Sequence, residues 1–411
     1  MIREHFGDKL RNENPEGWKE AHKRLYHYYK DLPDKELPDT LEEMEPLFAA
    51  VAHGCRAGLH QETLDDVYWK RICRSEKAFI NNELGAFGAD LAALSNFFDK
   101  PWSHPAAGLT EEVKAVVLSW AAFGLGAQGR LHEAIQPFKA GLEMRIKQEV
   151  WKSAAINAGN ISELMLTLGR VEEAVAYARE SVTHADQSED DFQMESKRTT
   201  LADALHQAGQ LEEAEQWFCQ AEEMQNERQR SYPFLYSLQG YQFCDLLLSQ
   251  GKYKDVMERA EKTLEWAILV KASLLALALD HLSLGRAWMM KAFVDGRRDF
   301  TKAMDYLNRA AAGLREAGTN DHLPRGLLAR AECYRYIKEF SKARADLNEA
   351  EEIAELGGMK LHLCDFHLEA GRLCLAEENE EQAEKHFSMA KKMIEETGYH
   401  RRDKEVERLR G

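Results

Sequence analysis

A hexapeptide that returns about every forty residues constrains this fold more than any other feature of the sequence. The chain reads "GRLHEA" at residues 129–134, "GRVEEA" at 169–174 and "GQLEEA" at 209–214. The same final position recurs at Ala134, Ala174, Ala214, Val256, Ala303, Ala343 and Ala383, with intervals of 40, 40, 42, 47, 40 and 40 residues. Because an active site is normally built once, a motif with a fixed period indicates a repeated structural unit.

Three further columns keep the same register. Small residues follow the marker by seven positions at Gly141, Ser181, Ala221, Thr263, Ala310, Ala350 and Ala390. Small residues also precede it by twelve positions, at Ala122, Ser162, Ala202, Cys244, Ala331 and Gly371. Apolar residues follow it by four positions, at Phe138, Ala178, Phe218, Ala260, Leu307, Leu347 and Phe387. The fifth unit fits if Gly285 fills its missing position and the loop between its two helices, at "FVDGRRDF", is about six residues longer than in the other units. Short side chains let two antiparallel helices approach closely, so the columns predict helical hairpins.

The hexapeptide itself marks the joint of each hairpin. Its Gly suits the left-handed residue that ends a helix, and its "EE" suits the first turn of the next helix, where carboxylates oppose the positive end of the dipole. The sequence therefore predicts a helix end, a turn and a helix start at each repeat.

Composition supports an all-α chain. Only 9 of the 411 residues are Pro, helix-forming residues dominate, and we see no evident strands. The formal charge of −16 argues against a general nucleic-acid binder. No apolar stretch is long enough for a transmembrane helix, the first residues lack the pattern of a signal peptide, and seven cysteines lie far apart. We expect a soluble, cytoplasmic protein.

The columns resemble the tetratricopeptide repeat. That family places small residues at repeat positions 8, 20 and 27 and a bulky apolar residue at position 24. The resemblance covers about residues 111–397 and implies a right-handed α-solenoid of about seven to eight hairpins. The period of about 40 resembles the longer-helix variants of kinesin light chains and of sensor regions in bacterial signalling ATPases. Position 4 departs from the frequent Trp and the terminal Pro is missing, which leaves the superhelical pitch open.

The first 110 residues are helical but less regular. "GWKEAHKRLYHYYKDL" has helical spacing, and "GLHQET" at 58–63 resembles the hexapeptide inside a degenerate hairpin. One interpretation is a cap for the solenoid. A sharper one rests on "IREHFGDKL" followed by "AHKRLYHYY", which is similar to the segment after the winged-helix part of multidomain signal-transduction (STAND-type) ATPases. We therefore predict an N-terminal arm or cap at 1–110, the solenoid at 111–397, and a basic tail or helix end at 398–411.

Motifs of catalysis and metal binding are missing from the sequence. No phosphate-cradling Gly-x-x-x-x-Gly-Lys-Ser/Thr or dinucleotide-type glycine motif is present. The best candidate metal cluster comprises His362, Cys364, Asp365, His367 and Cys374. Cys364 and His367 could share a helical face, but His362 and His367 are five apart and do not, so packing explains the cluster better. We expect neither an enzyme nor a cofactor or metal site.

The resemblance implies that the first helix of each hairpin lines a concave groove, with position 9 pointing inward. That column reads Phe123, Glu163, Asp203, Asp245, Arg286, Glu332 and Arg372, and neighbouring inward positions add Asn160, Gln242, Tyr241, Arg325 and Arg335. We hypothesise that the acidic half accepts a basic or donor-rich segment, while Arg286, Arg325 and Arg372 accept an acidic or phosphate group. The alternative is that these residues pair with one another. The C-terminal "HRRDKEVERLRG" is interpreted as a solvated helix face.

The sequence favours a protein–protein interaction or ligand-sensing module. Its partner would be a protein or peptide in the groove, or a small ligand, with no nucleic acid and no membrane, and the chain would be a monomer or a weak oligomer. The resemblance implies the sensor part of a larger signalling ATPase system. The alternative is a stand-alone scaffold that joins two protein partners.

Overall fold

The computed structural model describes residues 2–296 and 298–408, and the chain divides into two compact units, Met1–Leu125 (unit 1) and Gly126–Gly411 (unit 2). The division falls inside α7 (Glu111–Ala127), one helix later than the predicted start of the array at residue 111. The three predicted segments at 1–110, 111–397 and 398–411 stay a prediction.

Unit 1 contains the irregular N-terminal helices. In order it comprises α1 (Ile2–Glu13), α2 (Pro15–Asp31), α3 (Leu41–Arg56), α4 (His60–Thr63), the π-helical η1 (Leu64–Cys73), η2 (Ser75–Lys77), α5 (Phe79–Asn82), α6 (Phe87–Leu94), η3 (Ser95–Phe97), β1 (Phe98–Lys100), β2 (His104–Pro105) and most of α7. The expectation that strands are missing is wrong here, because β1 and β2 form a short antiparallel pair. Backbone pairing across a tight turn, rather than a strand-like sequence, makes this ribbon.

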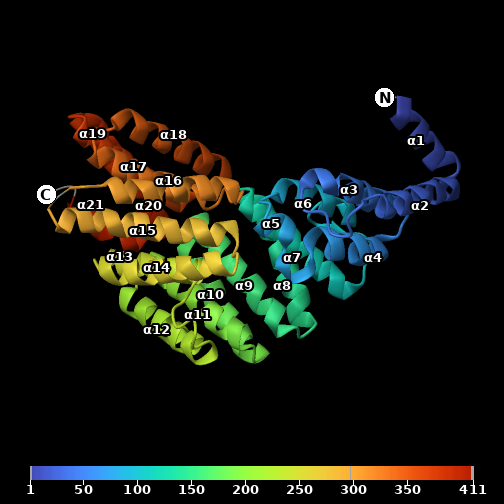
Figure 1. The fold of residues 1–411 in the computed structure, drawn as a ribbon, viewed down its shortest axis with the longest axis horizontal. Coiled ribbons are helices and arrows are strands. Elements are labelled where there is room, and N and C mark those ends of the chain that lie inside the picture. The colour runs from blue at the N-terminus through green and yellow to red at the C-terminus, as the bar shows by residue number, and fades with distance from the viewer. Residues whose placement is uncertain (1, 297, 409–411) are drawn as a thin grey trace. The chain divides into compact units, whose positions relative to one another are not determined.

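Unit 2 is a succession of helical hairpins (Figure 1). Its elements are α8 (Leu131–Lys147), α9 (Trp151–Thr167), α10 (Val171–Ser188), α11 (Asp191–Gln207), α12 (Leu211–Arg228), α13 (Ser237–Ser249), α14 (Tyr253–Leu269), α15 (Leu274–Val294), α16 (Thr301–Glu316), α17 (Leu323–Tyr336), α18 (Phe340–Gly357), α19 (Lys360–Ala376), α20 (Glu380–Thr397), η4 (His400–Arg402) and α21 (Asp403–Arg408). The predicted all-α solenoid is confirmed. Among the described residues, no helix is long and apolar enough to cross a membrane.

The hairpin joint lies where the hexapeptide predicts it. Gly169 has a φ of 76°, directly between the end of α9 and the start of α10. In the last two units Lys338 and Glu378 take the same left-handed position, with φ of 62° and 63°. A Gly is thus preferred at this joint but not required.

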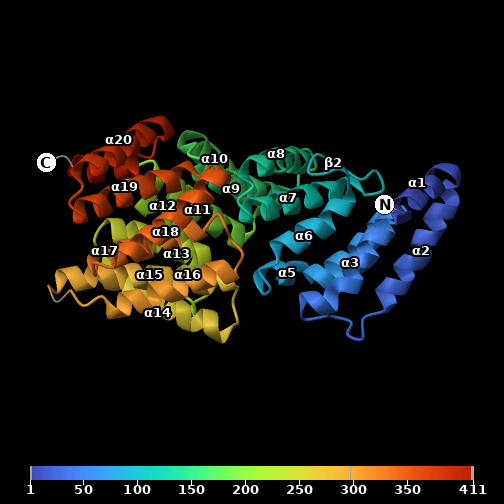
Figure 2. The same cartoon turned by 90° about the horizontal axis from the view of Figure 1, so that it is seen from above.

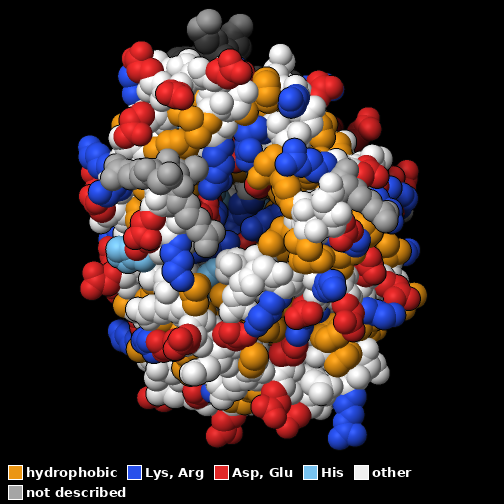
Figure 3. All heavy atoms as spheres, turned by 90° about the vertical axis from the view of Figure 1, so that its left-hand side faces the viewer, with side chains coloured by type: hydrophobic (Ala, Val, Ile, Leu, Met, Phe, Trp, Pro, Cys, Tyr) orange, Lys and Arg blue, Asp and Glu red, His pale blue; other side chains and the backbone are white. Residues whose placement is uncertain are grey.

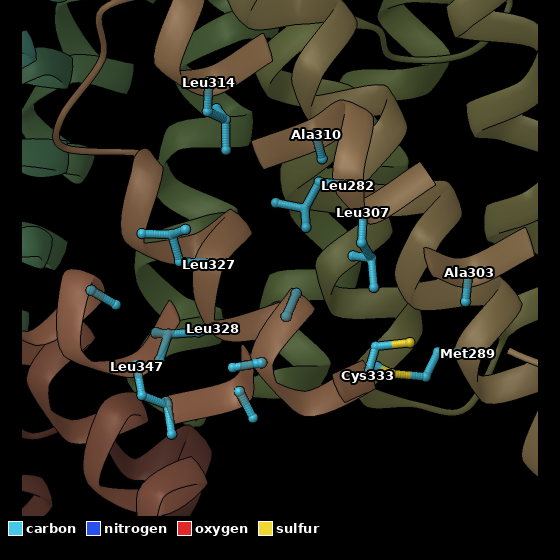
Figure 4. Close-up of a cluster of buried hydrophobic side chains, with 14 of the residues drawn as sticks. Leu282, Met289, Ala303, Leu307, Ala310, Leu314, Leu327, Leu328, Cys333 and Leu347 are labelled. Carbon is cyan, nitrogen blue, oxygen red and sulfur yellow. The ribbon is translucent and has the colours of Figure 1, made fainter. Parts of the chain in front are cut away.

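The small columns are buried at the contact between the two helices of each hairpin. A Cβ on Gly371 would lie 2.4 Å from the Phe387 ring, and one on Gly285 would lie 2.7 Å from Leu307. Phe387 and Leu307 both occupy the apolar column four residues after the marker, so Gly285 does complete the fifth unit. Figure 4 shows the apolar side chains around Leu307 in this core.

The insertion in the fifth unit is divided between helix and loop. Its first helix, α15, has 21 residues against 17 in α9, and α16 begins only at Thr301. The sequence predicted only a longer loop. The segment "WMMKAFV" is apolar enough to extend the helix by about one turn before Gly296 ends it.

The array of unit 2 curls until its last hairpins meet its first (Figures 1 and 2). The backbone N–H of Asn320 donates to the carbonyl of Ala127 at 2.7 Å, and Gln128 Nε2 donates to the carbonyl of Gly318 at 3.3 Å. Further along, a Cβ on Gly209 would lie 3.0 Å from His400. The concave side of the solenoid is therefore a partly enclosed hollow.

Candidate functional site

A cavity of about 770 Å³ occupies the concave side of unit 2. Its wall is formed mainly by the first helices of successive hairpins, α9, α11, α13, α15, α17 and α19, and by the C-terminal η4 and α21. In Figure 3 the face of unit 2 is hollowed at its centre, and Lys and Arg side chains dominate the interior of the hollow. Clefts of this volume are typical of sites for small ligands and short peptides.

The wall is rich in charges of both signs. The carboxylates are Asp203, Asp245, Glu332, Asp365, Glu369 and Glu405, and the cations are Arg286, Arg325, Arg372, Arg401, Arg402 and Lys404. The two sets are equal in number, so the ligand chemistry depends on which groups already have partners.

Most of the predicted groove residues face this cavity. Those in its wall are Asp203, Tyr241, Asp245, Arg286, Arg325, Glu332 and Arg372, whereas Asn160, Glu163, Gln242 and Arg335 are not among the lining residues. The residues predicted to point inward from the first helices therefore do line the cavity from α11 to α19. A binding role for these residues stays a prediction.

The four residues outside the wall have other surroundings. Gln242 is 3% exposed and donates to Asp203 at 3.5 Å, and Arg335 donates to Glu369 at 2.6 Å. Asn160 and Glu163 are half-buried on α9. Enclosure raises the pKa of Glu163 to about 7, against the opposing effect of Lys197. Glu163 therefore belongs to a separate polar group beside the cavity.

Asp245 lies at the centre of a charged cluster in the cavity wall. Arg286 Nη1 donates to its Oδ1 at 2.6 Å, and Arg401 Nη2 donates to the same oxygen at 2.9 Å while Arg401 Nη1 binds Oδ2. Burial alone would raise the pKa of the Asp245 carboxyl, but Arg401 and Arg286 hold it well below its usual range. Burial, followed by Arg401, lowers the pKa of the neighbouring His206 far enough to keep that ring neutral at pH 7.

Arg325 is differently placed, because it has no ion pair. The Arg325 guanidinium lies 5.7 Å from the ring centre of Tyr241, and no carboxylate of the described residues lies within the 4.0 Å of an ion pair. Its Nε is buried without a hydrogen-bond partner. Asp203, the wall carboxylate that most raises the pKa of Arg325, accepts instead from Gln207 Nε2 at 2.6 Å.

Guanidinium donors therefore outnumber acceptors in this part of the wall. Of the five N–H donors of Arg286, only those on Nη1 bind a described residue, and Arg325 has no carboxylate partner. Asp245 already accepts three hydrogen bonds. A ligand that supplies acceptor oxygens would satisfy the remaining donors.

A second cluster lies toward α19 and α21. Arg372 Nη2 donates to Glu405 at 2.6 Å, and Arg402 Nε donates to Asp365 at 2.8 Å. Arg402 also binds Glu405. Burial would raise the pKa of Glu405, but Arg402 and Arg372 lower it to about 2. The charged groups of this cluster therefore pair with one another. This is the arrangement expected if these residues do not bind a partner.

The C-terminal residues of the site were missed by the sequence analysis. The interpretation of "HRRDKEVERLRG" as a solvated face is wrong for Arg401, whose side chain is 6% exposed, and for Arg402, which is 19% exposed. Residues 409–411 of that stretch lie outside the described part of the chain. In the sequence, the only sign that this segment is buried was the pair of arginines close after Tyr399, whose side chain is 3% exposed.

The candidate metal cluster has no common centre. Cys364 is buried with its Sγ near the carbonyl of Ala390, His362 Nε2 lies 3.0 Å from the carbonyl of Asp321, and His367 pairs with His386. Over the residues that the structure describes, no group of three or more His, Cys, Asp or Glu side chains could hold a metal ion.

Comparisons with known proteins agree with the repeat. The sequence model of the tetratricopeptide repeat matches residues 198–228, which span most of α11, its joint and α12, and this confirms the resemblance. No curated protein matches the chain. Among solved structures, a Rap protein complexed with Competence and Sporulation Factor matches with a TM-score of 0.39 and 13% identity, covering 99% of this chain and 97% of that one.

A second solved structure is a signal transduction ATPase with numerous domains (STAND) with a tetratricopeptide repeat sensor, from Pyrococcus horikoshii. It matches with a TM-score of 0.32 and 12% identity, covering 94% of this chain and 55% of that chain. At these TM-scores, the function has to be argued from the residues of the cavity itself.

Proposed function

We propose that this array of tetratricopeptide-type hairpins is a non-catalytic binding module, and that it accepts an acidic peptide or small acidic ligand in the concave cavity of unit 2. The observation that carries the proposal is the surplus of guanidinium donors from Arg286 and Arg325 in the cavity wall. An oxyanion, either carboxylate or phosphate, is the group that matches a planar guanidinium fork.

The enclosure of the site supports sensing over scaffolding. A scaffold needs a broad surface to hold two proteins, whereas this cavity has about 770 Å³ and is narrowed where the later hairpins contact the start of the array. Such a space suits a short peptide, a chain end or a small molecule. We therefore place the chain as a sensor module, of the kind that serves a larger signalling ATPase system, ahead of a free-standing adaptor.

The site needs no chemical step. The cavity wall offers charge and hydrogen bonds, and no cysteine is among the described residues that line it. Binding is sufficient to explain the arrangement, because charges and hydrogen-bond donors in a hollow can hold a ligand without a chemical step.

Paired peptide probes test the proposal. Fluorescent peptides that contain Glu are compared with otherwise identical peptides that contain Gln, by fluorescence polarisation on the full chain. We expect tighter binding of the Glu peptides and a loss of about 10-fold to 100-fold in the variant Arg325→Ala, since a charge-assisted hydrogen bond contributes about 1.5–3 kcal/mol. Inorganic phosphate is included as a competitor to separate the two oxyanions.

A matched control is available on the outer face of the array. Arg309 of α16 pairs with Asp305 at 3.0 Å and its side chain is 58% exposed, so Arg309→Ala should bind the probes like the wild type. Equal binding of Glu and Gln peptides, or a loss of affinity in Arg309→Ala as large as that in Arg325→Ala, would contradict the proposal.

A further inference from the structure

The C-terminal segment 399–407 is built into the concave face, although it has little regular structure of its own. It consists of Tyr399, the three-residue η4 and the short α21. It supplies Tyr399, Arg401, Arg402, Lys404 and Glu405 to the cavity wall. Among the residues that the structure describes, this is the part of the chain after α20 that contributes to the cavity wall.

Arg401 joins this segment to the middle of the array. Its Nη1 donates to Gln207 Oε1 at 3.0 Å on α11, and its guanidinium binds both oxygens of Asp245 on α13. Arg401 and Asp245 are 156 positions apart in the sequence. The contact therefore depends on the curvature of the whole array.

The segment is anchored mainly by charges. Arg402 binds Asp365 and Glu405, the Tyr399 hydroxyl donates to Asp365 at 3.2 Å, and the apolar burial comes from Tyr399 and Val406. Apolar side chains that leave a core gain no equivalent contact with water, but charged groups are solvated when released. A segment held in this way can leave the wall without unfolding the hairpins.

The surface beneath Arg401 has the features of an arginine-binding site. Asp245 presents both carboxylate oxygens, Gln207 adds an amide oxygen, and Asp203 adds a further negative charge beside them. This is the acidic half of the groove that the sequence analysis assigned to a basic segment. In the structure that half is occupied by the chain's own residue.

We propose that the Asp203–Gln207–Asp245 surface is an arginine-binding site, and that Arg401 is its resident occupant and holds segment 399–407 as a latch over the cavity. Release of Arg401 opens this part of the wall and frees the site for an arginine of a partner protein. The inference goes beyond the proposed function, because it concerns the acidic side of the cavity and does not depend on which ligand the guanidinium donors bind.

Hydrogen exchange with chemical rescue tests the latch without any cavity ligand. In full-length Arg401→Ala we expect the backbone amides of residues 399–407 to exchange at least about 10-fold faster, while those of α13 and α19 keep their protection. Ethylguanidinium, which replaces the missing side-chain fork, should restore protection of the segment, whereas ethylammonium should not. Rescue should be lost in Arg401→Ala combined with Asp245→Asn.

Three results would overturn the inference. The first is unchanged exchange of residues 399–407 in Arg401→Ala. The second is faster exchange throughout α9 to α20, which would make Arg401 a general stabiliser of the fold. The third is the absence of guanidinium-specific rescue. Arg309→Ala should show wild-type exchange in every condition, because its ion pair is exposed on α16.

Discussion

Asp90 in unit 1 and Asp245 in unit 2 are both buried carboxylates, yet they have opposite surroundings. Asp90 is 0% exposed and accepts hydrogen bonds from the neutral groups of Tyr68 at 2.5 Å, Asn81 at 2.8 Å and Trp120 at 3.1 Å. Asp245 is 6% exposed, binds Arg286 and Arg401, and lines the cavity.

The difference separates a structural network from a candidate functional one. Every partner of Asp90 comes from within 30 positions of it, and the network is closed to solvent. Asp245 is bound by a residue 156 positions away, beside arginines that still have free donors. A closed neutral network fixes one local arrangement, whereas a charged network at a cavity can exchange its partners.

The largest expected effect is the loss of the closed network. Asp90→Ala leaves the buried donors of Tyr68 and Asn81 and the partly buried donor of Trp120 without an acceptor. A buried unsatisfied donor costs about 1–3 kcal/mol, so we expect the free energy of unfolding to fall by about 3–5 kcal/mol. Chemical denaturation followed by tryptophan fluorescence measures it, since Trp120 is one of the partners. Asp99→Ala, at an exposed position, is the control and should change stability by less than about 0.5 kcal/mol. If Asp90→Ala and Asp99→Ala lost similar amounts of unfolding free energy, the Asp90 network would not be a special source of stability.

A smaller effect should distinguish the two carboxylates by pH. Burial raises the pKa of Asp90 to about 6, so the native state binds this proton more tightly than the unfolded state and stability falls as pH rises. From about pH 5 to about pH 7 the wild type should lose about 1 kcal/mol that Asp90→Asn does not lose. Unfolding curves of both proteins at the two pH values measure this difference.

Asp245 should behave in the opposite way. Its native pKa is depressed, so its contribution is fully present above its ordinary pKa of 3.8 and is lost only as pH falls below that value. The destabilisation by Asp245→Asn should therefore be the same at about pH 5 and about pH 7. If the destabilisation by Asp245→Asn changed between the two pH values in the same direction as that by Asp90→Asn, the two networks would not be distinct.

The repeat and the orientation of its first helices could be predicted because they follow from local spacing. Ala174 and its equivalents pack where the columns place them, and Gly285 does complete the fifth unit against Leu307. The same register put Asp203, Asp245 and Arg286 on the concave side. Spacing within a hairpin is a property of neighbouring residues and can be read from one sequence.

Contacts that depend on curvature could not be predicted in this way. Arg401 reaches Asp245 only because the array curls through several hairpins, and the accumulated angle is set by small packing differences at each one. For the same reason the sequence did not show that Arg335 is engaged by Glu369 of the next unit. Asp90 was missed because a lone carboxylate in "FGADLAAL" gives no indication of its three donors.

The most direct test of the central claim, that Arg401 occupies the acidic surface at Asp245, is a double-mutant cycle between Arg401 and Asp245. The free energies of unfolding of the wild type, Arg401→Ala, Asp245→Ala and the double variant give the coupling between the two side chains. The structure predicts a coupling of about 1.5–3 kcal/mol, as for a buried hydrogen bond between charged groups. Additivity within about 0.5 kcal/mol would show that the two residues do not interact and would contradict the occupation of this surface by Arg401.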